Sequence, residues 1–335
     1  MLVDPSSKPI VLAILPTLAK NLDLLLKCIK SVKASDFNHT LSLIIIVNDP
    51  DVVLNPIDNV TVISPGLNLG FNGGLVFGSQ LFESEFIWIL QDDVLVNSNT
   101  LSELYEEIIS NPRVSMLSPR RRDSKGNFPA CGGWFDNNGN ITGFYSEALN
   151  EARNYKIPRK LNWVSSSGSL IQKKMWETLG GYDLDLYPLG FGDVDFCDRA
   201  ATQGYEFSLS DVAIIEHEHL SSSTPSLLRD FLSQSTSQIF SQKKQKIWMT
   251  KSISHSVSPE IIAKIAQKAS VIIPKLSEFA SNDYLHAQLL QAKSDYDYLH
   301  AQLLQAKVDL EAITQSRIWR ISKPYRLLRK YIQNL

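Results

Sequence analysis

The sequence predicts an α/β fold with a mostly parallel, doubly wound sheet. In the first two hundred residues, short apolar runs typical of buried strands alternate with segments whose apolar residues recur at helical spacing. This alternation is the βαβ rhythm of a parallel sheet with helices on both faces. Polar residues stand where several apolar runs stop, and such sheets bind ligands at the carboxyl ends of their strands. The pattern therefore predicts both the fold class and the edge of the sheet that carries the site.

The first elements have clear boundaries. Residues 10–15 form a short buried-strand pattern, and residues 22–32 repeat apolar positions at helical spacing. Residues 41–47, with the sequence LSLIIIV, form a second strand pattern that ends at Asn48 and Asp49. A strand, a helix and a second strand in this order predict the first βαβ unit of the sheet.

A glycine-rich segment, NLGFNGGLVFGSQLF, follows a third strand expected at residues 60–63. Its glycines allow a tight turn and a close approach of the backbone at the start of a helix. The segment matches neither GxGxxG nor a P-loop, so an ordinary turn from loop to helix is the alternative interpretation. The glycines are Gly70, Gly73, Gly74 and Gly78.

An acidic pair follows the next strand. The run EFIWILQDDVLV, residues 85–96, has the composition of a buried strand that ends at Gln91, Asp92 and Asp93. Two adjacent carboxylates repel each other, and burying them unpaired is costly. A hard divalent cation removes that cost and takes its other ligands from water and phosphate. The alternative is that the two aspartates only cap the turn after a strand.

The composition changes after residue 225. Residues 226–280 are rich in Ser, Gln and Lys and predict a helical connection. The segment DYLHAQLLQAK then occurs twice, at residues 283–293 and 297–307, with apolar residues at heptad spacing. Residues 281–316 are therefore predicted as a short coiled coil, and we expect a homo-oligomer. The alternative is a single helix that packs on its own chain.

The last segment, residues 317–335, is a basic amphipathic tail. It carries six Lys and Arg residues and no acidic residue, with aromatic and aliphatic residues between them. Such a pattern suits peripheral contact with the anionic cytoplasmic leaflet of a membrane. A solvated basic tail is the alternative.

Length and composition limit the classes of function. At 335 residues, with 44% hydrophobic and 20% charged residues, the chain can bury a full core. The 33 Lys and Arg residues nearly balance 35 Asp and Glu residues, and the net charge of −2 argues against a nucleic-acid-binding protein. Three widely spaced cysteines, Cys28, Cys131 and Cys197, support neither a disulfide framework nor a zinc site. No apolar stretch reaches about 18 residues, so we expect a cytoplasmic protein.

Four sequence blocks resemble those of bacterial family-2 glycosyltransferases of the GT-A fold, including rhamnosyltransferase-like and galactofuranosyltransferase-like members. In order they are NLGFNGG, LQDDV, WVSSSGSLIQKKMWETLGGYD and GFGDVDFCDRAATQGYEFSLSDVAIIEHEH. The resemblance covers about residues 8–225 and implies a Rossmann-like GT-A domain over residues 1–225. It also implies an inverting transfer of a sugar from a nucleotide-sugar donor to a saccharide acceptor, lipid-linked in our interpretation, during synthesis of a surface polysaccharide. The implied cofactor is Mn²⁺ or Mg²⁺.

The resemblance also assigns residues to the donor and the metal. Asp93 matches the metal-binding aspartate of the family's DxD-type motif, and Gln91 replaces the first aspartate of that motif. Of the two histidines that end the last block, His217 fits a metal or diphosphate ligand best and His219 is the alternative. Trp163 lines the pocket by resemblance, and a core position is its alternative. The residues implied to bind the donor are Thr17, Asn48, Asp49, Asn68, Gly73, Gly74, Asp92 and Trp163.

Asp193 and Asp195 are the candidate catalytic residues. Asp193 matches the proposed general base of the family, and Gly192 replaces the acidic residue that usually precedes it. The chemistry needs one carboxylate within hydrogen-bond reach of the acceptor hydroxyl. The alternative is the start of an amphipathic helix, with Asp195 paired to Arg199 four residues later.

Two other functions remain open from the sequence. A sugar nucleotidyltransferase needs a Gly-rich loop with Lys or Arg directly after the first strand, where this chain offers only Lys20. An inactive scaffold that uses the coiled coil is favoured by Gln91 and Gly192, because both replace acidic residues of the family pattern.

Overall fold

The computed structural model describes most of residues 2–217 and a few positions after them. All described residues belong to the first of two compact units, Met1–Val271. The predicted coiled coil at 281–316, the tail at 317–335 and most of the connection at 226–280 lie outside the described residues. The described residues are 2–123, 126, 128, 131–135, 141–143, 161–187, 190–217, 236, 237, 239–241, 243 and 267.

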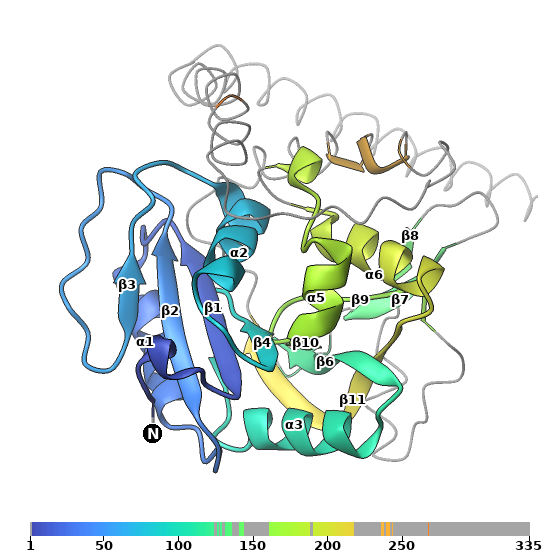
Figure 1. Cartoon of the computed structure of the whole chain (residues 1–335), viewed down its shortest axis with the longest axis horizontal. Helices are drawn as coiled ribbons and strands as arrows, with labels where there is room; N and C mark the ends of the chain where they lie inside the picture. The colour runs from blue at the N-terminus through green and yellow to red at the C-terminus, as the bar shows by residue number, and fades with distance from the viewer. Residues whose placement is uncertain are drawn as a thin grey trace, which may run out of the picture. The chain divides into compact units, whose positions relative to one another are not determined.

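One eight-stranded sheet dominates the described residues, in the order β3-β2-β1-β4-β10-β6-β11-β5 (Figure 1). Strands β3, β2, β1 and β4 are mutually parallel, and β6 is parallel to β11. Strands β10 and β5 run antiparallel to their neighbours. The predicted mostly parallel α/β fold is confirmed. The strands are β1 (Val11–Thr17), β2 (Leu41–Val47), β3 (Thr61–Ile63), β4 (Phe86–Ile89), β5 (Val94–Val96), β6 (Val114–Arg122), β10 (Leu170–Gln172) and β11 (Glu206–His217).

Helices cover both faces of the sheet. Helix α1 buries residues at helical spacing, and these join α3 and one face of the central strands in a single apolar cluster. Helix α2 covers the opposite face, where Gly78 lies so close to the strands that a Cβ would approach Ile14 Cγ2 to 2.8 Å. The helices are α1 (Leu22–Lys33), α2 (Gly70–Leu81), α3 (Thr100–Ser110), α5 (Lys173–Leu179) and α6 (Gly192–Thr202).

A second, smaller sheet adjoins the start of α6. It contains β7 (Gly132–Phe135), β8 (Ile141–Gly143) and β9 (Trp163–Val164), all antiparallel, in the order β8-β7-β9. Strand β9 contacts α6 directly. The apolar patterns of the sequence did not indicate this sheet, because its strands are short.

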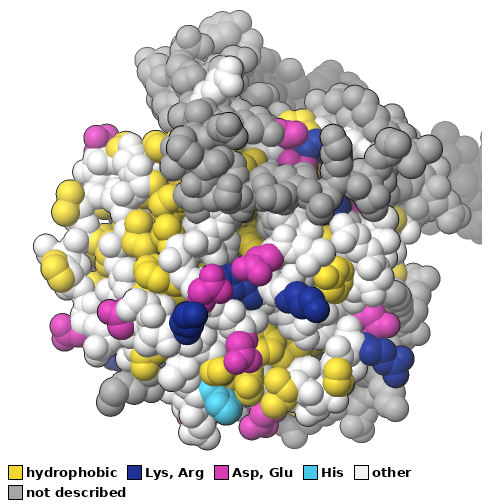
Figure 2. Space-filling view, viewed as in Figure 1, with side chains coloured by type: hydrophobic (Ala, Val, Ile, Leu, Met, Phe, Trp, Pro, Cys, Tyr) yellow, Lys and Arg dark blue, Asp and Glu magenta, His cyan; other side chains and the backbone are white. Residues whose placement is uncertain are grey.

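The surface and the cysteines agree with the composition. Figure 2 shows acidic and basic side chains intermixed on the visible face, as expected for a nearly neutral chain. Cys28, Cys131 and Cys197 are buried free thiols. In the described part of the chain, no helix is both long enough and apolar enough to cross a bilayer.

Candidate active site

The carboxyl ends of β1 and β4 bring two predicted donor residues into contact. Thr17, the last residue of β1, donates a hydrogen bond from Oγ1 to Asp92 Oδ2 over 2.6 Å. The same hydroxyl accepts a hydrogen bond from the backbone N–H of Ala19 over 2.8 Å. Burial raises the pKa of Asp92, and so does the neighbouring charge of Asp93, whereas the Thr17 hydrogen bond lowers it. Thr17 therefore stabilises the carboxylate form of a partly buried acid.

The glycine turn packs against the ends of β1 and β2. Asn48 donates a hydrogen bond from Nδ2 to the backbone carbonyl of Gly70 over 2.9 Å, and Asn68 Oδ1 accepts one from the Gly70 N–H over 2.8 Å. A Cβ at Gly74 would lie 2.8 Å from Pro16 Cβ, a distance too short for any side chain. Glycine is thus required here because α2 begins directly against the strand ends.

Asp49 has a partner that the sequence did not predict. Lys20, from the loop after β1, forms an ion pair with Asp49, which also accepts a hydrogen bond from the Asp51 N–H over 3.0 Å. The Lys20 hydrogen bond holds the pKa of Asp49 below its usual value. Lys20, the basic residue after the first strand that the nucleotidyltransferase alternative would use, is therefore engaged with a carboxylate beside the predicted donor site.

Asp93 and His217 converge at the other end of the acidic pair. His217, the last residue of β11, pairs with Val94, and its Nε2 lies 3.2 Å from Asp93 Oδ1. Both side chains are buried. Two neighbouring ligands of one octahedral cation lie about 3 Å apart when each bond is about 2.1 Å. The separation of the two donor atoms is therefore compatible with two neighbouring ligands of one divalent cation.

Among the described residues, a cation at this position meets two side-chain ligands, Asp93 and His217. The described residues contain no group of three or more His, Cys, Asp or Glu side chains that could hold a metal. Asp93 and His217 supply two donor atoms, and diphosphate oxygens and water are the usual remaining ligands of Mg²⁺ in such sites. His219 lies outside the described residues, so the choice between the two histidines remains a prediction.

Asp193 lies in the first turn of α6. Its Oδ2 accepts a hydrogen bond from the Ser166 N–H over 3.3 Å, and its Oδ1 accepts one from the Val194 N–H over 2.9 Å. Burial raises the pKa of Asp193, and these backbone donors oppose the shift. A carboxylate with a raised pKa is a better proton acceptor than an ordinary one.

Two adjacent serines connect the base to the acidic pair. Ser166 contacts Asp193, and Ser167 donates a hydrogen bond from Oγ to Gln91 Oε1 over 2.8 Å. Gln91 precedes Asp92 and Asp93, so one short turn between β9 and β10 touches both ends of the candidate site. Gln91 therefore has a defined place in the site although it replaces an aspartate of the family pattern.

Arg121 is a site residue that the sequence analysis missed. It lies on β6 opposite Ile215 and is only 8% exposed, and its charge interacts with those of Asp93 and Asp193. Burial lowers the pKa of Arg121, whereas the carboxylates raise it. Successive side chains of a strand point to opposite faces of the sheet. This alternation turns Arg121 inward and leaves Arg120 and Arg122 half-buried, and it is the signal by which the sequence could have indicated Arg121.

Asp195 has the surroundings of a structural residue. It is fully buried, and Arg199 Nε lies 2.8 Å from its Oδ2, the ion pair that the four-residue spacing predicts. Arg199 also donates to the backbone carbonyls of Leu179 and Gly181 over 2.7 and 2.8 Å. The pair therefore joins α6 to the end of α5.

Residues after the sheet also contact the start of α6. Phe191, which precedes α6, has a φ of 56°, an uncommon conformation for a bulky residue, and its ring stacks on Phe240. Trp163 packs against the same cluster, beside α6. Lys243 forms ion pairs with Asp183 and with Asp185, the latter at 2.9 Å. The cluster surrounds the segment that carries Asp193.

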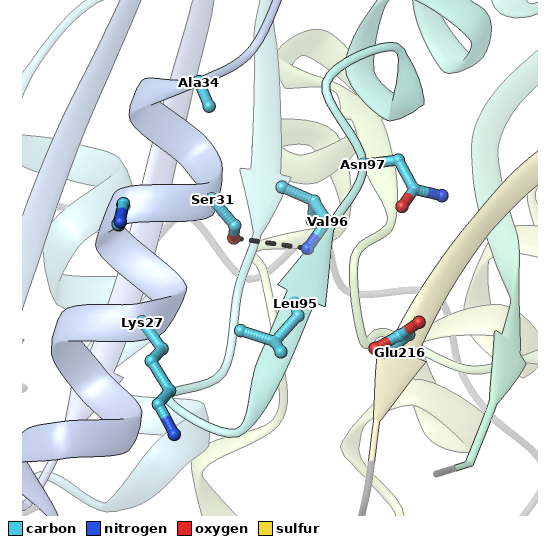
Figure 3. Close-up of a pocket in the computed structure, with 8 residues that line it drawn as sticks. Lys27, Ser31, Ala34, Leu95, Val96, Asn97 and Glu216 are labelled. Carbon is cyan, nitrogen blue, oxygen red and sulfur yellow. Dashed lines mark hydrogen bonds between the residues drawn. The ribbon is translucent and has the colours of Figure 1, made fainter. Parts of the chain in front are cut away.

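A separate surface pocket of about 400 Å³ lies between α1 and β5 (Figure 3). Inside it, Ser31 Oγ accepts a hydrogen bond from the Val96 N–H over 3.2 Å. The pocket contains none of the predicted site residues. Its lining residues are Lys27, Lys30, Ser31, Ala34, Leu95, Val96, Asn97 and Glu216.

Comparison with known proteins identifies the domain. Residues 13–179 match the model of glycosyl transferase family 2. This domain of the chain is a family 2 glycosyltransferase domain. The matched residues include the glycine turn, the acidic pair and the turn at Ser166 and Ser167, and they end before α6. Among curated proteins, no sequence matches this glycosyltransferase.

Solved structures match the fold of the glycosyltransferase. The crystal structure of GalNAc-T7 with UDP, GalNAc and Mn²⁺ matches with a TM-score of 0.50 and 13% identity, over 63% of this chain and 44% of that one. The crystal structure of S. aureus TarS 1-349 matches with a TM-score of 0.43 and 12% identity, over 62% of this chain and 60% of that one. The chain thus spans less than two thirds of the length of either protein, and the first likeness shows the GT-A fold.

Proposed function

We propose that this glycosyltransferase moves a sugar from a nucleotide diphosphate sugar to a hydroxyl group of a saccharide acceptor, with inversion at the anomeric carbon. The observation that carries the proposal is the turn at Ser166 and Ser167. This turn contacts the candidate base Asp193 on one side and Gln91, next to the acidic pair, on the other. A donor-holding group and a proton acceptor are therefore fixed relative to each other, as a single displacement requires.

The donor end of the site would bind the nucleotide and its diphosphate. Thr17, Asn48, Asp49, Asn68, Gly73 and Gly74 surround the strand ends and the start of α2, where backbone N–H groups favour anions. Asp93 and His217 would hold Mn²⁺ or Mg²⁺. When bound, such a cation neutralises the charge that develops on the departing diphosphate.

The acceptor end of the site would remove one proton. Asp193 takes the proton of the acceptor hydroxyl while the acceptor oxygen forms a bond to the anomeric carbon. The bond from that carbon to the diphosphate oxygen breaks on the opposite face, and its electron pair leaves with the nucleoside diphosphate. Arg121 favours the ionised form of Asp193 before the transfer. Asp195 is assigned a supporting role because its carboxylate is committed to Arg199.

The place of the reaction follows from the sequence. A cytoplasmic protein with a basic tail at residues 317–335 suits a lipid-linked acceptor at the inner face of the membrane, as in the assembly of a bacterial surface polysaccharide. The coiled coil at 281–316 would make the enzyme a homo-oligomer. Both features stay predictions, since they lie outside the described residues.

A donor panel tests the proposal. The purified full-length protein is incubated with Mn²⁺, a set of nucleotide sugars and a set of saccharide acceptors, and the released nucleotide is identified. Acceptor-dependent release of a nucleoside diphosphate, with an inverted glycosidic product, is the expected result. Release of pyrophosphate would support the nucleotidyltransferase alternative. No release with any donor, together with no thermal shift, would support an inactive scaffold.

A further inference from the structure

The side chain of Asn72 occupies the space beside Gly192. A Cβ added at Gly192 would lie 2.6 Å from Asn72 Oδ1 and 2.8 Å from Asn72 Nδ2. Real Cβ atoms do not approach other heavy atoms so closely, so no side chain fits at position 192 while Asn72 keeps its place. Position 192 is the one at which the family resemblance expects an acidic residue.

Burial and one hydrogen bond hold the Asn72 side chain in that place. It lies in the first turn of α2, between the predicted donor residues Asn68 and Gly73, and is 1% exposed. Its Nδ2 donates a hydrogen bond to the backbone carbonyl of Leu186 over 3.2 Å. Leu186 belongs to the segment that leads into α6, and it packs in one cluster with Val194 of that helix. The Asn72 side chain thus connects the glycine turn to the segment that precedes Asp193.

The start of α6 depends on such contacts because it has little local support. Its N-cap residue, Phe191, makes no side-chain hydrogen bond to the helix and adopts a left-handed backbone conformation. Helices without a side-chain cap lose one of the usual determinants of where they begin. A strained residue keeps its conformation only when the surrounding structure enforces it. The side chains packed around residues 191 and 192 therefore help to set the position of Asp193, together with its hydrogen bond from the Ser166 N–H.

We propose that Asn72 is a positioning residue that fixes the start of α6, and hence the base Asp193, against the glycine turn that holds the donor. Gly192 is required because its missing side chain leaves room for the Asn72 amide. Asn72 and Gly192 thus act as a pair, and the pair stands where relatives place an acidic side chain at position 192. The inference rests on the proposed role of Asp193 as the base.

Four variants of the full-length enzyme test the pair. Gly192→Glu should lower kcat by about 10-fold to 100-fold with little change in donor Kd, because a small displacement of the base is costly. Asn72→Gly with Gly192→Glu removes the overlap and should recover kcat to within about threefold of Asn72→Gly alone, the sign of direct coupling. Ala201→Glu adds the same side chain at an exposed position of α6 and should leave kcat and donor Kd unchanged.

Each outcome either supports or overturns the positioning role of Asn72. Wild-type turnover in Gly192→Glu, or no recovery in the double variant, would overturn the positioning role. If Gly192→Glu fails to fold, Gly192→Ala adds only the Cβ and replaces it in the same comparison. Near-normal turnover in Asp193→Asn would contradict the proposed function instead. An Asp193→Asn variant that has lost turnover, together with no coupling between Asn72 and Gly192, would contradict only the role of Asn72.

Discussion

The two halves of the sheet carry site residues in different ways. In the half formed by β3, β2, β1 and β4, the strands are parallel and polar residues lie at the strand ends or within three residues after them, as at Thr17, Asn48 and Asp92. In the half formed by β10, β6, β11 and β5, the strands are mixed. There the site residues come from the body of a strand, the end of another, a serine turn and the start of a helix.

This difference separates two kinds of chemistry. The parallel half presents backbone N–H groups and short polar side chains at one edge, which suits the binding of a nucleotide and its phosphates. The mixed half buries Arg121 and contributes Asp193 and His217, whose roles depend on burial and on charges brought together by tertiary pairing. The effect of a substitution should therefore depend on which half of the sheet it changes.

The largest effect is expected at the junction of the two halves. Asp93→Ala removes the carboxylate that would anchor the cation, and turnover should fall by about 10³-fold or more because metal stabilisation supplies several kcal/mol. Initial rates in Mn²⁺ measure the loss. Asp51→Ala, which removes an exposed acid near the donor half, is the control and should retain activity. Substantial Mn²⁺-dependent turnover in Asp93→Ala would place the cation elsewhere.

The next effect separates the two aspartates of α6. Asp193→Asn should keep the melting temperature and lower turnover by about 10²-fold, because the amide cannot accept a proton. Asp195→Asn should instead destabilise the fold by about 3 kcal/mol, because it leaves Arg199 without its buried partner. Thermal unfolding and turnover of both variants check the contrast. If the two variants unfold at the same temperature, Asp195 cannot be distinguished from Asp193 as the structural residue of the pair.

A smaller effect is expected on the pH profile. Burial raises the pKa of Asp193 and the charge of Arg121 lowers it. Turnover requires the deprotonated base, so it falls as the pH drops through the folded-state pKa, which lies above that of an ordinary carboxyl group. Arg121→Gln should therefore move the acid limb of kcat/KM to a higher pH. Arg122→Gln, which removes the half-buried partner of Glu216, should leave the limb in place. An unchanged limb in Arg121→Gln would show that its charge does not reach the base.

The smallest effect concerns the residues after the sheet. Lys243→Ala removes the ion pairs to Asp183 and Asp185 and should lower the free energy of unfolding by about 1 kcal/mol. Lys243→Arg keeps both charges paired and should retain most of the stability. Chemical denaturation compares them. Identical unfolding midpoints for wild type and Lys243→Ala would mean that this segment does not support the mixed half.

The sequence predicted the parallel half well because its signals are local. The helical spacing at residues 22–32 corresponds to α1, and the run LSLIIIV is β2. The acidic pair follows β4 as predicted, and the next three residues form β5 at the far edge of the sheet. That placement depends on pairing with β11, which no local pattern encodes.

The sequence predicted which types of residue form the candidate site, but not which residues they contact. The spacing of Asp195 and Arg199 indicated their ion pair. Lys20, Arg121 and the Ser167 contact of Gln91 were not predicted, because each depends on segments that meet only in the folded chain. The fit between Asn72 and Gly192 was hidden for the same reason, since the residues lie 120 positions apart.

The central claim is that one side chain, Asp93, helps to bind the donor and another, Asp193, removes the proton. Measuring the donor affinity of Asp93→Ala and Asp193→Asn tests this claim most directly. Calorimetric titration of a nucleotide sugar into the wild type and each variant, with Mn²⁺ and then with a chelator, gives the six values needed. Asp193→Asn is predicted to bind the donor with the wild-type Kd and the wild-type dependence on Mn²⁺. Asp93→Ala is predicted to bind weakly and equally in both conditions. A normal Mn²⁺-dependent Kd in Asp93→Ala, or loss of donor binding in Asp193→Asn, would contradict the division of the site.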